Sequence, residues 1–154
     1  MESSVWGKVE GNVIEVLDGN TIAILTDKGH TRKKVYLAGI GAPAMVERKW
    51  KAAREMLARL VLNKHVAITI SPSLKMGTDE AAADELSGVV PLPGLSVNRK
   101  MIELGLARDK KPEPFSMSNY EACEYRIIER AARANGQGLW EIDGITHYLD
   151  GATH

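Results

Sequence analysis

The sequence predicts an α+β protein in which five short antiparallel strands form a small barrel accompanied by three helices. Two observations predict this class. Apolar and polar residues alternate with a period of two over several short stretches, as expected for strands with one buried face. In three other stretches apolar residues recur at spacings of three and four, which is typical of helices with one buried face.

The first three strands are expected before residue 40. Residues 8–17 alternate, and Asp18-Gly19 is a strong signal for a hairpin turn because both residue types accept a positive φ. The β-branched stretch 21–25 supplies the partner strand. A second turn at Asp27-Lys28-Gly29 leads into the third strand at 34–38.

The remaining elements follow as a helix, two strands and two helices. They are expected at 45–62, 65–70, 87–92, 97–104 and 120–134. Ser118 and Asn119 can cap the last helix, and residues 71–86 are expected to form a loop. Five short strands with a helix after the third fit a Greek-key OB barrel. We expect one domain over 1–154, with its core at about 8–141 and a tail at 142–154.

Length and composition describe an ordinary globular chain. Its 154 residues suit one domain, 44% of them are hydrophobic and 26% are charged, and the formal net charge is zero. The N-terminal residues include an early acid and no apolar run, and no stretch approaches the roughly 18 apolar residues of a membrane span. With a single cysteine, the protein is expected to be cytoplasmic, without disulfides or a cysteine-based zinc site.

That cysteine, Cys123, shares one face of the last expected helix with Tyr120, Ile127 and Ala131. A small thiol on an apolar helix face is more often a core residue than a nucleophile. We therefore expect Cys123 to be buried. The histidines, at positions 30, 65, 147 and 154, show no metal-ligand spacing along the chain.

The neutral total conceals an uneven distribution of charge. Residues 28–64 contain ten Lys/Arg against Glu47 and Glu55, a local net charge of +8. Residues 79–85 carry four acids and no base. A solvated helix face and a solvated loop explain both runs. The alternative is a basic surface for a polyanion.

Several segments resemble the staphylococcal-nuclease (thermonuclease) family. Asp18-Gly-Asn-Thr21 and Leu37-Ala-Gly-Ile-Gly-Ala-Pro43 are similar to the first half of that domain. Gly94-Leu-Ser-Val-Asn-Arg-Lys-Met-Ile-Glu-Leu-Gly-Leu-Ala107 and the terminal Gly138-Leu-Trp140 are similar to its second half. The resemblance covers about residues 9–141 and implies the same OB barrel.

The resemblance also implies where a metal would bind. In that family a calcium ion held by two aspartates assists attack of water on a phosphodiester. These aspartates fall on Asn20, whose amide lacks the negative charge, and on Gly41, which offers no ligand. Thr21 matches its family position, although it also suits the start of a strand. We therefore expect neither calcium nor another cofactor.

The resemblance places the other catalytic roles on residues that cannot perform them. The general base falls on Ala44, and the first of two arginines falls on Tyr36. The second arginine falls near Glu85 or Leu86. Glu47 is the one nearby carboxylate that could replace the base, but it also suits an ordinary position at a helix N-terminus.

These losses predict a catalytically inactive nuclease-like OB module that binds nucleic acid or a protein. The residues expected to contact phosphates are Arg32, Lys33, Lys34, Lys49 and Lys51. Binding to single strands is expected to be weak and tolerant of sequence. Two alternatives stay open. One is a phosphodiesterase with a rebuilt site, and the other is a purely structural interaction domain using the edge at 91–93 or the tail.

Overall fold

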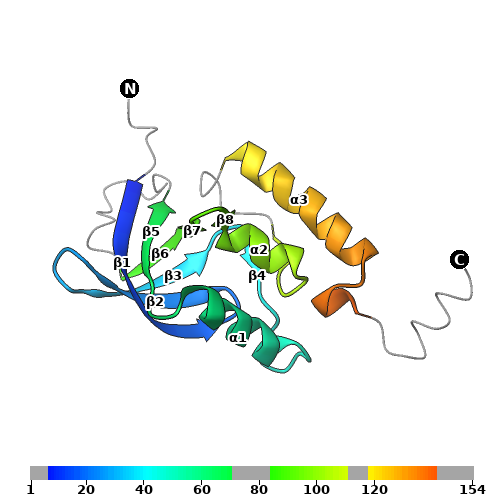
Figure 1. Cartoon of the computed structure of the whole chain (residues 1–154), viewed down its shortest axis with the longest axis horizontal. Helices are drawn as coiled ribbons and strands as arrows, with labels where there is room; N and C mark the ends of the chain where they lie inside the picture. The colour runs from blue at the N-terminus through cyan, green and yellow to red at the C-terminus, as the bar shows by residue number, and fades with distance from the viewer. Residues whose placement is uncertain (1–6, 71–83, 111–117, 142–154) are drawn as a thin grey trace, which may run out of the picture.

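The computed structural model of the chain describes residues 7–70, 84–110 and 118–141 (Figure 1). Its centre is a curled sheet of five strands. They are β1 (Gly7–Asp18), β2 (Thr21–Thr26), β3 (Arg32–Leu37), β5 (His65–Ile70) and β6 (Glu85–Gly88), in the spatial order β5-β1-β2-β3-β6. The first half of β1 pairs with β5 and the second half pairs with β2. This exchange of partners, together with two register shifts against β2, bends the sheet into a half-barrel.

The predicted fold class is confirmed, but one pairing differs from the expected antiparallel barrel. β3 and β6 run parallel, with Val35 opposite Leu86. Because a helix and β5 lie between these strands in the sequence, the chain can cross the barrel and return to β3 in the same direction. Just beyond β6, Thr69 and Val89 exchange two backbone hydrogen bonds of 2.9 Å. The ends of the curled sheet therefore meet at this point.

The fifth strand, expected at 87–92, is divided. β6 ends at Gly88, and β7 (Pro91–Leu92) forms a small hairpin with β8 (Leu95–Ser96). Pro91 cannot donate to a continuing ladder, and Gly94 turns the hairpin with a φ of +80°. Another short pair joins β4 (Ile40–Gly41) to β9 (Arg108–Asp109). Two-residue strands leave no periodic signal in a sequence.

The helices are α1 (Trp50–Val61), α2 (Val97–Glu103) and α3 (Asn119–Ala134), followed by a 3-10 turn at Gly138–Trp140. α1 begins later than the expected residue 45, because residues 45–49 form turns. Ser118 caps α3 as predicted, since its hydroxyl accepts a hydrogen bond of 3.0 Å from the Glu121 N–H. Within the described ranges, no helix combines the length and apolar character that crossing a membrane requires.

The core lies between the sheet and helices α1 and α2. Its fully buried large side chains include Val13, Ile22, Ile24, Val35, Leu57, Val61, Ile68, Met101 and Ile102. A buried asparagine, Asn98, stands among them with its amide satisfied. Its nitrogen donates to the Ala38 and Gly88 carbonyls at 3.0 and 3.2 Å, and its oxygen accepts from the Val90 N–H at 3.1 Å. Asn98 therefore ties α2 to the ends of β3 and β6.

α3 turns a different face to the core than expected. Tyr125 and Ala132 are buried, whereas Cys123 is exposed, as are Tyr120 and Ile127. The prediction that Cys123 is a core residue is therefore wrong. Periodicity detects apolar positions on α3, but it does not tell which of them α2 covers.

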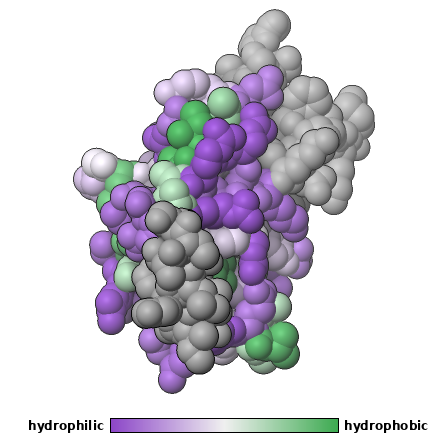
Figure 2. Space-filling model, turned by 90° about the vertical axis from the view of Figure 1, so that its right-hand side faces the viewer, coloured by the Kyte–Doolittle hydropathy of each residue, from purple (hydrophilic) through white to green (hydrophobic). Residues whose placement is uncertain are grey.

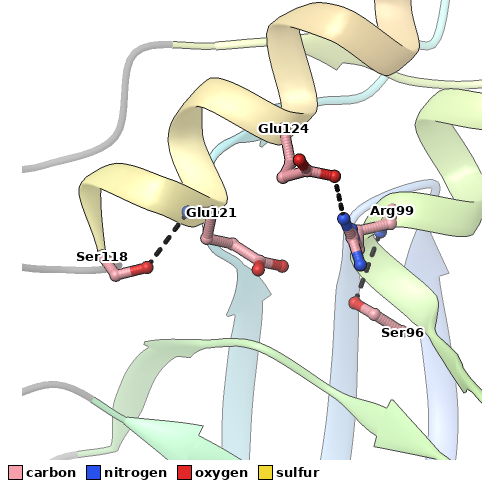
Figure 3. A network of polar contacts seen from close by, with 5 residues as sticks. All are labelled: Ser96, Arg99, Ser118, Glu121 and Glu124. Carbon is pink, nitrogen blue, oxygen red and sulfur yellow. Dashed lines mark hydrogen bonds and ion pairs between the residues drawn. The ribbon is translucent and has the colours of Figure 1, made fainter.

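Polar contacts fix how α3 lies against α2 (Figure 3). Arg99 of α2 forms an ion pair with Glu124 of α3. Ser96 and Ser118 cap the two helices, each accepting a hydrogen bond from a backbone N–H three residues later. The N-termini of both helices are therefore capped, and an ion pair joins α2 to α3.

Gly19 is needed for a reason other than the one expected. Gly19 does not have a positive φ. A Cβ at position 19 would instead lie 2.8 Å from the Cβ of Ala53 and 3.1 Å from the Cβ of Ala42. The turn after β1 packs directly against α1, so this position must lack a side chain. The Asp18 carboxylate supports the turn by accepting from the Asn20 N–H at 3.0 Å.

Candidate nucleic-acid interface

One end of the barrel collects residues that are far apart in the sequence. Thr21 pairs with Tyr36 across β2 and β3, and the Leu37 N–H donates to the Asn20 carbonyl at 2.8 Å. The Asn20 side chain then reaches the Ile40 carbonyl, to which its Nδ2 donates at 3.2 Å. The positions that family resemblance singled out on β2, β3 and β4 therefore lie together.

Both the nitrogen and the oxygen of the Asn20 side-chain amide form hydrogen bonds. Its nitrogen donates to Ile40, and its Oδ1 accepts a hydrogen bond of 3.0 Å from the Thr21 hydroxyl. Thr21 itself is only 4% exposed. These contacts hold the turn beside β4, which a carboxylate could not do because it has no hydrogen to donate to Ile40.

Basic side chains lie beside Gly41. Gly41 pairs with Arg108 across β4 and β9, and a Cβ at Gly41 would meet the Lys110 side chain at 3.6 Å. Neither Arg108 nor Lys110 was among the expected contact residues. The basic run that begins at Arg108 is visible in the sequence, but its pairing with Gly41 depends on a two-residue strand.

Glu47 is held by its neighbours and lies in a turn before α1. Its carboxylate accepts a hydrogen bond of 2.6 Å from the Ala44 N–H and one of 2.8 Å from Arg108. The Arg108 contact, followed by the Ala44 N–H, lowers the pKa of Glu47 from its ordinary value. Glu47 is therefore ionised at neutral pH, and both of its oxygens already have donors. A lowered pKa also makes it a weaker base.

Trp140 connects this end of the barrel to the C-terminal part of the domain. Arg133 of α3 lies 4.4 Å from the Trp140 ring centroid, and Arg108 lies 6.0 Å from it. Arg108 is thus placed by its strand pairing, by Glu47 and by an aromatic ring. The face of the molecule viewed toward α3 is predominantly hydrophilic, with separate apolar patches (Figure 2).

The expected phosphate contacts occupy different elements. Arg32 and Lys34 alternate with Lys33 along β3, and Lys33 is only 5% exposed. Lys33 is therefore not available as a surface contact. Lys49 directly precedes α1, and Lys51 lies exposed in its first turn.

Acids from outside residues 28–64 pair with several of these cations. The ion pairs are Arg32–Glu15 at 2.8 Å, Lys34–Glu85 at 3.8 Å, and Lys49–Glu141 at 3.0 Å, with Arg48 also 3.8 Å from Glu141. The positive charge that is concentrated in the sequence is partly neutralised in space. Residues 79–83 of the acidic stretch lie outside the described part, but its end at Glu85 lies beside Lys34.

A comparison of the sequence with protein families agrees with this architecture. The model described as "Staphylococcal nuclease homologue" matches residues 34–142, more than half of the chain. The chain belongs to the staphylococcal nuclease homologue family.

Similar proteins share the same region of sequence. "Protein ParB" of Escherichia coli is 29% identical over 146 residues, which cover 90% of this chain and 76% of that protein. A "Micrococcal nuclease" of Shigella flexneri is 29% identical over 141 residues, covering 88% and 75%. An "Uncharacterized endonuclease" of Escherichia coli O157:H7 is 26% identical over 133 residues, covering 86% and 77%.

Membership in the staphylococcal nuclease homologue family confirms the resemblance found in the sequence. The matched region contains Tyr36, Gly41 and Ala44 and begins after Asn20 and Thr21. The pairing of Thr21 with Tyr36 and the hydrogen bond from Asn20 to Ile40 of β4 nevertheless place Asn20 and Thr21 at the same end of the barrel.

Proposed function

We propose that this staphylococcal nuclease homologue binds nucleic acid through backbone phosphates and does not hydrolyse it by the calcium-dependent route. The composition of one end of the barrel carries the proposal. Asn20, Gly41 and Ala44 offer no carboxylate where the family resemblance places the metal ligands and the base. Arg108 and Lys110 lie beside Gly41 instead. Cations at this place favour a phosphate and disfavour a calcium ion.

The size of the catalytic losses supports the absence of hydrolysis. Removal of a general base costs about 10²–10⁴ in rate. Removal of one preorganised donor to the reacting group costs about 10²–10³. Such losses are not additive. Several of them together still leave no efficient reaction by the family mechanism.

The surface cations can exchange their protein partners for phosphates. Arg32 and Lys34 are about half exposed, as are their partners Glu15 and Glu85. Exposed ion pairs of this kind contribute only about 0–1 kcal/mol, so a phosphate can displace the carboxylate at small cost. We assign Arg32, Lys34, Lys49 and Lys51 as contacts and leave out the buried Lys33.

A nuclease assay with a restored site tests the catalytic part of the proposal. The purified chain should not degrade single-stranded DNA or RNA above background in excess calcium. The variant Tyr36→Arg/Gly41→Asp/Ala44→Glu/Asn20→Asp should gain activity that a chelator removes. Chelator-sensitive hydrolysis by the parent chain would overturn this part.

A salt titration tests the binding part. Three to four phosphate contacts predict a slope of about −2 to −3 for log affinity against log salt with single strands. The variant Arg32→Gln/Lys34→Gln should flatten the slope by about 1.4, equally for all sequences. Arg126→Gln/Arg130→Gln on α3 removes the same charge and should leave the slope unchanged. If the parent does not bind at low salt, a protein partner becomes the better assignment.

A phosphodiesterase with a rebuilt site is the second candidate, because Glu47 and Arg108 lie together beside β4. If hydrolysis is found, Glu47→Gln should abolish it, whereas Glu55→Gln on the exposed face of α1 should not. Activity that persists in Glu47→Gln would reject this second mechanism.

A further inference from the structure

Glu10, Asp27 and His65 meet on the surface of the barrel. Glu10 lies in β1, Asp27 directly follows β2, and His65 begins β5. One ligand atom from each side chain lies within 4.8 Å of the other two, and His65 Nε2 is 2.7 Å from Asp27 Oδ2. All three side chains are open to solvent. No spacing along the sequence indicates this cluster, because each residue comes from a different strand region.

The backbone places the three residues rigidly. β1 lies between β2 and β5, with Gly11 opposite Thr26 on one side and Asn12 opposite His65 on the other. The Asp27 N–H also donates to the Glu10 carbonyl at 2.9 Å. Sites built on strands hold their geometry better than sites built on loops alone. Because the backbone positions are fixed, small changes in side-chain rotamer are enough to bring the three ligand atoms toward a common point.

The cluster is separate from the end of the barrel described above. Thr21 begins β2 at that end, and Asp27 follows its last residue, Thr26. Six residues of extended strand span about 20 Å. None of the three residues corresponds to a position that the family resemblance assigned.

The two carboxylates of the cluster favour the binding of a cation. Two carboxylates converge on one imidazole, and their mutual repulsion is relieved by positive charge placed between them. An imidazole nitrogen with two carboxylate oxygens is a ligand set that zinc accepts, whereas calcium takes oxygen ligands only. We propose that Glu10, Asp27 and His65 bind a divalent transition-metal ion of the zinc class, with water completing the coordination. Zinc–ligand distances of about 2.0–2.2 Å require the His65–Asp27 contact to open slightly and Glu10 to move closer.

Calorimetric titration of the full, untagged chain with zinc tests the site. After treatment with a chelator, the parent should bind one zinc ion per chain. His65→Gln and Asp27→Asn should each weaken binding by at least about tenfold, because the loss of even an outer-shell partner costs about 10–100-fold in metal affinity. Excess calcium should not displace the zinc. The control His30→Asn removes an exposed histidine at a position with a φ of +46°, which asparagine accepts, and should bind as the parent does.

Glu10→Gln separates a three-residue site from a simple His–Asp pair. It should weaken zinc binding to a similar degree while leaving the circular dichroism spectrum unchanged. A melting-temperature increase on adding zinc, present in the parent and lost in all three variants, provides a second measurement. The proposal is overturned if the parent does not bind zinc, if the three variants bind as the parent does, or if His30→Asn loses binding equally. The result is independent of nucleic-acid binding and of hydrolysis.

Discussion

At the scale of single residues, hydrogen bonding explains why Asn20 suits its place. The amide donates to the Ile40 carbonyl and accepts from the Thr21 hydroxyl, so it links the β1–β2 turn to β4. An aspartate would keep the acceptor and lose the donor. We expect Asn20→Asp to lower the free energy of unfolding by about 1 kcal/mol, measured by urea denaturation. An equal or higher stability would mean that the amide does not hold β4.

His65 should titrate at an elevated pH. The hydrogen bond to Asp27, with the nearby charge of Glu10, raises the pKa of His65 above its ordinary 6.5. A raised folded-state pKa adds stability that is complete below the unfolded pKa and is lost as pH rises through the folded value. In chelator-treated protein, NMR titration of the imidazole should show a lower pKa in Asp27→Asn than in the parent. Glu15→Gln, which removes another carboxylate from β1, should not change it.

Variants of Tyr125 can distinguish what its ring contributes to the free energy of unfolding from what its hydroxyl contributes. The side chain is fully buried, and burial raises the pKa of Tyr125 far above its ordinary 10.0. The hydroxyl lies near Glu121 and Ser96 but makes no hydrogen bond of ordinary geometry. Tyr125→Phe should therefore leave the free energy of unfolding unchanged or increase it.

Tyr125→Ala is the companion variant, because it empties the space that the ring fills between α2 and α3. It should cost about 3–5 kcal/mol in thermal or chemical denaturation. A large loss in Tyr125→Phe would show instead that the hydroxyl has a partner in solution.

At the scale of elements, one close approach sets the position of α1 on the barrel. The turn at Gly19 lies against Ala53 of α1 and against Ala42. We expect Gly19→Ala to cost about 1–3 kcal/mol by overpacking, measured by urea denaturation. Gly41→Ala is the matched control, because its Cβ would meet its nearest neighbour at 3.6 Å, an ordinary contact. Equal stability of the two variants would mean that α1 can shift without cost.

The alternation of β3 divides its basic residues between two environments. Arg32 and Lys34 project to the outer side with Tyr36, and the Lys34 ammonium lies 5.9 Å from the Tyr36 ring. Lys33 projects to the opposite side and is buried. Three consecutive cations in a sequence therefore supply only two surface charges once they belong to a strand.

At the scale of the whole molecule, acids distant in sequence limit the basic surface. Glu85 pairs with Lys34, and Glu141 pairs with Lys49. If the surface binds phosphates, Glu85→Gln/Glu141→Gln should raise the affinity for single strands and steepen the salt slope. Glu55→Gln/Glu103→Gln changes the same charge on other exposed positions and should have a smaller effect. Unchanged affinity in the first variant would place the nucleic acid elsewhere.

Much of the fold can be predicted from the sequence because it depends on local periodicity. Alternation placed β1, β2, β3 and β5 within a few residues, and the helices α2 and α3 were found with their Ser118 cap. Family-like segments in the right order then indicated the barrel, which the structure and the family comparison confirm. These features require only neighbouring residues and their order.

The candidate sites depended on contacts that no local pattern encodes. The parallel pairing of β3 with β6, the buried face of α3 and the reason for Gly19 each follow from what packs opposite. Arg108 reached Gly41 through two-residue strands, and His65 met Asp27 across β1. The sequence by itself determined most of the longer elements, their order, and which residues stand at the positions that the family resemblance singles out. Tertiary structure alone decided which side chains meet, because strand pairing and helix docking join residues whose separation along the chain carries no signal.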